Sequence, residues 1–99
     1  MTNENDRRIN QKHIQEKIKS IAETYTNNMY DTFQQPGMKG PAFTWKRFPR
    51  LAAEQASGMA FIYFSNWDTF SDELRRTVEQ QVYDLAVELA QKKITGKEK

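Results

Sequence analysis

The 99-residue sequence contains no cysteine, a single histidine, and only four glycines and three prolines. The absence of cysteine excludes disulfide scaffolds, thiolate metal sites and cysteine nucleophiles, and it fits a reducing cytoplasm. Long apolar runs are also missing, since the longest, Met59 to Phe64, is far shorter than the roughly 18 residues of a membrane span. Residues 1–10 are polar with no apolar run behind them, so no secretory signal is predicted. We therefore expect a soluble cytoplasmic protein that does not enter a membrane.

A strong excess of one charge is lacking as well. Fifteen basic and thirteen acidic residues give a net charge of +2, which is too weak to indicate a nucleic-acid binder by itself. The distribution is more informative, because no acidic residue occurs from Thr32 to Ala53, a segment that contains Lys39, Lys46, Arg47 and Arg50. Small size, absence of cysteine and a polar start also suit a phage or mobile-element product.

Aromatic residues are abundant in the middle of the chain. The length allows one domain spanning residues 1–99, and the aromatic content of 12% is too high for a disordered chain. Nine of the twelve aromatic residues lie in this middle segment: Phe33, Phe43, Trp45, Phe48, Phe61, Tyr63, Phe64, Trp67 and Phe70. Because aromatic side chains carry the largest buried areas, the segment must supply most of the core, a binding surface, or both.

The flanking arms have helical periodicity, and the sequence predicts an all-α, three-helix domain with helices near residues 10–34, 49–64 and 70–94. In the first arm, apolar residues recur every three or four positions from Ile14 to Phe33. In the third they recur likewise from Leu74 to Leu89, with Ser71 as the expected N-cap and Lys92 and Lys93 in the last turn. Residues 1–9 and 95–99 are expected to fray.

The middle segment is harder to assign. Two prolines and two glycines in residues 36–41 predict a loop, and residues 42–48 fit either a short strand or an extended loop. Pro49 suits the first turn of a second helix, in which Ala52, Ala56 and Ala60 form a small-residue stripe that another helix can approach. The run Met59–Phe64 is apolar on every face, so it fits a buried helix or a buried strand, and helix is favoured because an isolated two-stranded ribbon is marginal.

No residue pattern indicates catalysis, a metal site or a cofactor. His13 lies on a polar stretch, where an exposed surface histidine is the ordinary outcome. The acidic residues Asp68, Asp72 and Glu73 lack the spacing of a calcium loop and fit a helix start. Asp72 is expected to pair with Arg76 four residues on. The sequence therefore predicts a protein that is not an enzyme.

The strongest functional candidate is the aromatic and basic segment around Trp45. The predicted partner-binding residues are Trp45, Lys46, Arg47, Phe48, Arg50 and Trp67. Tryptophan and arginine dominate protein-interface energetics, while rings interleaved with cations also bind unpaired bases and phosphates. A third interpretation is structural, with the rings buried and the cations pointing into solvent.

Three functions follow from these alternatives. The first is a protein-interaction domain that regulates or inhibits a larger assembly. The second is a nucleic-acid-binding regulator that uses residues 39–50, whose affinity would fall steeply with salt. The third is a structural subunit of a homo-oligomer, in which the two long helical arms pair between chains, for example in a homodimer.

Overall fold

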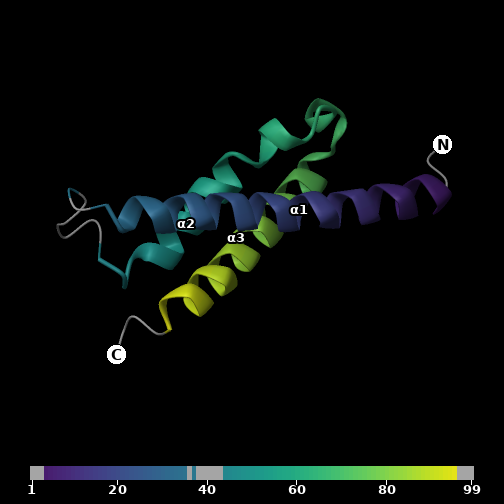
Figure 1. Cartoon of the computed structure of the whole chain (residues 1–99). Helices are drawn as coiled ribbons and strands as arrows, with labels where there is room; N and C mark the ends of the chain where they lie inside the picture. Colours follow the sequence, from purple (N-terminus) through teal and green to yellow (C-terminus); the bar gives the residue numbers. More distant parts are fainter. Residues whose placement is uncertain (1–3, 36, 38–43, 96–99) are drawn as a thin grey trace.

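The described residues form three α-helices, with a turn just before the second and two short 3-10 helices between the second and the third. Figure 1 shows their arrangement. The computed structural model describes residues 4–35, 37 and 44–95, and for residues 4–11 it describes the backbone alone. The elements in chain order are α1 (Glu4–Phe33), α2 (Phe48–Gly58), η2 (Ala60–Tyr63), η3 (Trp67–Thr69) and α3 (Asp72–Ile94). Within the described ranges there is no β-strand, which confirms the all-α prediction and excludes a strand for residues 44–48 and 59–64. Of the predicted loop over residues 36–41, only Gly37 lies within the described residues, and Phe43 also lies outside them.

The helices run alternately up, down and up, so α2 is antiparallel to the other two (Figure 1). At a rise of 1.5 Å per residue, α1 is about 45 Å long, and its N-terminal turns extend past the other helices. The first helix is therefore longer than predicted, because it starts at Glu4 rather than near residue 10. The molecule is elongated, with dimensions of 53 × 22 × 17 Å.

Alanines line the places where the helices approach one another. The predicted stripe of Ala52, Ala56 and Ala60 is fully buried, as are Ala86 and Ala90 on α3. Small side chains allow two helix backbones to approach closely, so α2 lies tightly between its neighbours. On α3 the buried face consequently includes these alanines. Leu85 and Leu89, which the apolar spacing placed on the buried face, are only half-buried at its edge.

The core of the described residues consists of two hydrophobic clusters. The larger one joins the middle of α1, including Ile18 and Ile21, to Val78 and Val82 of α3 and to Phe64. The smaller one lies where α1 ends, α2 begins and α3 ends, and it contains Phe33, Phe48, Ala52, Ala90 and Ile94. This second cluster brings three distant parts of the sequence to the same end of the molecule.

The second helix is shorter than predicted. It ends at Gly58, where glycine costs about 1 kcal/mol relative to alanine in a helix interior, and Met59 closes the last turn with backbone bonds to Gln55 and Ala56. The following residues form the tighter η2, in which the Ile62 amide donates to the Met59 carbonyl at 3.2 Å. The predicted continuous helix to residue 64 is therefore wrong in extent.

The third helix is as predicted. It begins after Ser71, whose Oγ accepts a hydrogen bond from the Leu74 amide at 3.0 Å. This side-chain cap satisfies one of the amides that a helix start leaves without a partner. Asp72 and Glu73 occupy the first turn, and Lys92 and Lys93 the last, so the charges oppose the helix dipole at both ends.

Candidate functional site

Four aromatic rings form a cluster at the junction of α1 and α2. Trp45 packs against Tyr30 and Phe33, each at a centroid distance of 5.4 Å, and against Phe48 at 5.3 Å. Phe48 is 0% exposed, whereas Trp45 is half-buried. The prediction that Phe48 contacts a partner is therefore wrong, because neighbouring side chains cover its ring. Phe48 instead anchors the segment that carries Trp45.

The cations of this segment point outward. Residues 44–47 form a turn in which the Arg47 amide donates to the Thr44 carbonyl at 2.9 Å. Lys46 and Arg47 are exposed in this turn, between the inward-packed rings of Trp45 and Phe48. Arg50 is also exposed, and its Nε donates to Glu54 Oε2 at 3.0 Å. The structure thus brings Trp45, Lys46, Arg47 and Arg50 together on one surface.

The start of α2 adds to the positive character of this surface. Arg47 occupies the N-cap position without a side-chain cap hydrogen bond, and the first turn contains no acidic residue. A helix N-terminus carries a partial positive charge that acidic side chains normally offset. Here that partial charge and the basic side chains reinforce each other.

Two further lysines reach the same end from α3. Lys93 Nζ lies 4.9 Å from the centroid of the Tyr30 ring, and Lys92 Nζ lies 3.6 Å from Glu88 Oε1. Figure 1 shows that the start of α2 and the end of α3 lie at the same end of the molecule. We call this surface the basic end, and it consists of Trp45, Lys46, Arg47, Arg50, Lys92 and Lys93. In the sequence the two lysines indicated only the end of a helix. Successive helices of a small bundle usually run antiparallel, and that order was the signal that could have placed them near Arg47.

Trp67, the remaining predicted contact residue, lies in a different place. Its ring is half-buried against Phe64 and Phe70, at centroid distances of 5.7 and 5.5 Å. These rings belong to the larger core cluster, near the start of α3. The structure therefore does not bring Trp67 together with Trp45.

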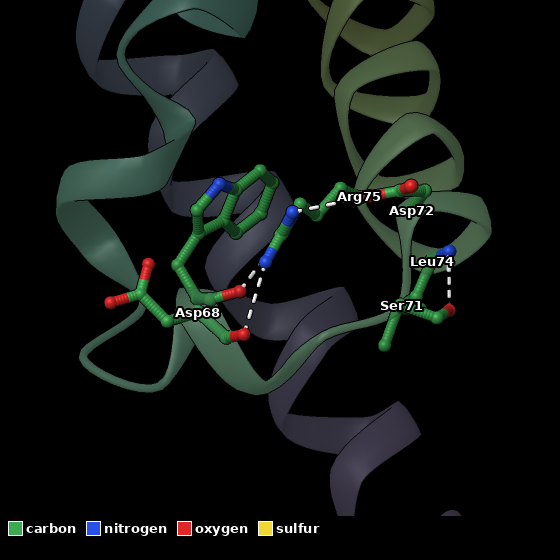
Figure 2. A network of polar contacts seen from close by, with 6 residues as sticks. Asp68, Ser71, Asp72, Leu74 and Arg75 are labelled. Carbon is green, nitrogen blue, oxygen red and sulfur yellow. Dashed lines mark hydrogen bonds and ion pairs between the residues drawn. The ribbon is translucent and has the colours of Figure 1, made fainter.

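Arg75 holds the turn that contains Trp67 and Asp68, and Figure 2 shows it beside Asp68. Its Nε donates to the Trp67 carbonyl at 3.1 Å and its Nη2 to the Asp68 carbonyl at 3.0 Å. Its Nη1 also pairs with Asp72 Oδ1 at 3.2 Å, so the acidic residue pairs with Arg75 and the predicted pairing with Arg76 is wrong. Arg75 thus has a structural position at the start of α3, far along the helix from the basic end.

Two large apolar residues are exposed on η2. Phe61 is 53% and Ile62 55% exposed, although the sequence predicted that this run would be buried. The adjacent Ala60 and Phe64 are buried, and Lys17 Nζ donates to the Tyr63 carbonyl at 2.6 Å. The tight 3-10 turn is therefore fixed to α1 while it presents Phe61 and Ile62, which we call the apolar tip, to solvent.

A groove of about 520 Å³ runs between α1 and the segment before α3. It is lined by Ile14, Phe64 and Phe70 and by polar residues that include His13, Ser65 and Ser71. Among the described residues, no hydrogen bond joins His13 to either serine, and the Ser71 hydroxyl already accepts from the Leu74 amide. In the same part of the chain, no group of three or more histidine, aspartate or glutamate side chains is placed to hold a metal ion. His13 itself is exposed.

The chain matches no known protein family, no curated protein and no solved structure at a significant level. Over the described ranges, no helix combines the length and the apolar character required to cross a membrane.

Proposed function

We propose that this protein is a small helical interaction domain that binds another protein through the basic end and has no catalytic activity of its own. The observation that supports the proposal best is the position of Trp45. Its ring is partly exposed, rests on the fully buried Phe48, and is followed in the chain by the exposed cations Lys46 and Arg47. Tryptophan and arginine side chains that are supported by well-packed neighbours are typical of the residues that dominate binding energy at protein interfaces.

The proposed role is regulatory. A domain of 99 residues with one small binding surface acts by occupying or positioning a larger partner, as a regulator or inhibitor of an assembly does. A reducing cytoplasm is the proposed compartment because the chain contains no cysteine. Origin in a phage or mobile element stays a prediction from size and composition.

The test is affinity capture from the native host with variants of the basic end. Immobilised wild-type protein should retain a defined protein that the double variant Trp45→Ala/Arg47→Ala loses. The control is Lys19→Ala/Arg76→Ala, which removes exposed cations elsewhere. Because loss of the Trp45 ring weakens the aromatic cluster, Arg47→Glu alone serves as a second variant, and circular dichroism checks each fold. Equal capture by wild type and both basic-end variants would refute the proposal.

A structural homo-oligomer is the second candidate, and the apolar tip favours it. Two adjacent large apolar side chains that are more than half exposed form a small patch that a second chain could cover. If they contact a second copy, the native mass measured by light scattering should be a multiple of the chain mass. The variant Phe61→Ser/Ile62→Ser should then restore the monomer mass. A monomeric wild type across the micromolar range would exclude this candidate.

A further inference from the structure

We infer that the basic end binds an acidic segment of the partner protein, one that alternates carboxylates with an apolar or aromatic residue. This inference rests on the proposed function and specifies the chemistry of its partner. It depends on side chains that come from two helices far apart in sequence and meet only in the folded protein.

The aromatic cluster connects the cation at the end of α3 with the cations before α2. The Lys93 ammonium lies over the Tyr30 ring at 4.9 Å, and Tyr30 contacts Trp45 at a centroid distance of 5.4 Å. Lys46 and Arg47 follow Trp45 directly in the exposed turn. The partly exposed Trp45 ring is therefore followed in the chain by two exposed cations just before α2, and the Tyr30 ring that it contacts carries a third cation from the end of α3.

The cations differ in how far acidic neighbours balance them. Arg50 and Lys92 each pair with a glutamate on their own helix, at 3.0 and 3.6 Å. Lys46, Arg47 and Lys93 form no ion pair with any residue of the described chain. These three charges are the ones that carboxylates of a partner would complement, and such complementarity sets both the association rate and the choice of partner.

The observations favour an acidic protein segment over a nucleic acid. A nucleic-acid site typically neutralises several phosphates, about six to ten in well-studied cases, whereas the chain has a net charge of only +2 and two of the five cations are already paired. Among the described residues, three other rings pack against the Trp45 ring. Only part of it is therefore available, which suits contact with a side chain better than stacking with a base.

The experiment measures binding of three fluorescein-labelled probes by anisotropy. They are a peptide of about twelve residues that repeats Glu-Glu-Phe, the same peptide with Gln for Glu, and an oligothymidylate of similar length, each at about 50 and 150 mM salt. We expect the acidic peptide to bind at least roughly tenfold more tightly than the other two at either salt concentration. Tighter binding of the oligothymidylate, or equal binding of the Glu and Gln peptides, would overturn the inference.

Matched variants locate the binding. Lys46→Gln/Arg47→Gln/Lys93→Gln should weaken binding of the acidic peptide at least about tenfold. The control Lys12→Gln/Lys19→Gln/Arg76→Gln changes the net charge equally at exposed positions elsewhere and should retain the wild-type affinity. If the two triple variants bind alike, the inference is wrong. If the natural partner is lost with Trp45→Ala/Arg47→Ala yet retained by the basic-end triple variant, the proposed function stands and only the acidic chemistry fails.

Discussion

The guanidinium of Arg75 binds the carbonyl of Trp67 across eight residues, with a distance of 3.1 Å from Nε. The same side chain binds the next carbonyl, that of Asp68, at 3.0 Å (Figure 2). One residue in the second turn of α3 thus donates to two backbone carbonyls of η3, the 3-10 helix that precedes α3. This arrangement fixes how the chain enters α3, and with it the position of the ring cluster around Phe64.

Replacing Arg75 should destabilise the protein. We expect Arg75→Ala to lower the free energy of unfolding by about 2 kcal/mol, because hydrogen bonds to charged donors contribute about 1.5–3 kcal/mol. Urea denaturation followed by circular dichroism measures the change. Arg76→Ala is the matched control, since Arg76 is the exposed neighbour and should alter stability by less than about 0.5 kcal/mol. Equal effects of the two substitutions would contradict the structural role of Arg75.

Thr26 offers an opportunity to stabilise the fold. Its side chain is fully buried in α1, and its hydroxyl has no hydrogen-bond partner among the described residues. A buried polar group without a partner is destabilising relative to an apolar group of the same shape, so Thr26→Val should raise the free energy of unfolding by about 1 kcal/mol. Thr24→Val, at a half-buried position of the same helix, is the control for β-branching. A decrease in stability for Thr26→Val would show that the hydroxyl has a favourable partner.

The alanine contacts between helices predict sensitivity to larger side chains. Ala56 is 0% exposed on the face of α2 that packs in the core. Ala56→Leu should destabilise the protein by about 2–3 kcal/mol, because an overpacked core forces backbone shifts. Gln55→Leu places the same side chain at the adjacent exposed position and should cost little. Thermal unfolding of both variants distinguishes a tight helix contact from a general intolerance of leucine in α2.

Stability should fall at alkaline pH through Tyr25. Burial raises the pKa of Tyr25, and the neighbouring Tyr63 raises it further. Below a pH of about 10, the usual pKa of tyrosine, both the folded and the unfolded chain keep the proton, and the contribution of Tyr25 is fully present. Above that pH the unfolded chain loses its proton first, so stability declines as pH rises toward the folded pKa. The urea midpoint should therefore drop less between pH 9 and pH 11 in Tyr25→Phe than in wild type, and an equal drop in the two proteins would contradict the prediction.

Local features of the chain were predictable because their causes are local. The apolar spacing of Ile18 and Ile21 on α1 and of Val78 and Val82 on α3 places each pair on a buried face, whatever the rest of the chain does. The Ser71 cap likewise depends only on a hydroxyl and an amide three residues apart. Such patterns specified three helices and part of the face that each one buries, although on α3 the buried face includes Ala86 and Ala90 in place of Leu85 and Leu89.

The composition of the candidate site depended on tertiary contacts. Trp45 and Phe48 are only three residues apart and similar in chemistry, yet Phe48 is covered by Ala52, Ala90 and Ile94 of the small cluster while Trp45 remains partly exposed. Which ring is covered is decided by which helix passes over it, and periodicity along one segment contains no information about that. The same holds for Lys93, which reaches Tyr30 only because α3 ends where α1 ends.

The sequence by itself therefore determined the helical class, the alanine stripe and the accumulation of rings and cations in the middle of the chain. The tertiary structure alone decided that Phe48 is an anchor, that lysines of α3 join the basic end, and that Phe61 and Ile62 face solvent. The physical reason is that helix formation follows from hydrogen bonds and spacing within a few residues. The exposure of a side chain and the charged groups that surround it, in contrast, follow from contacts between residues separated by tens of positions.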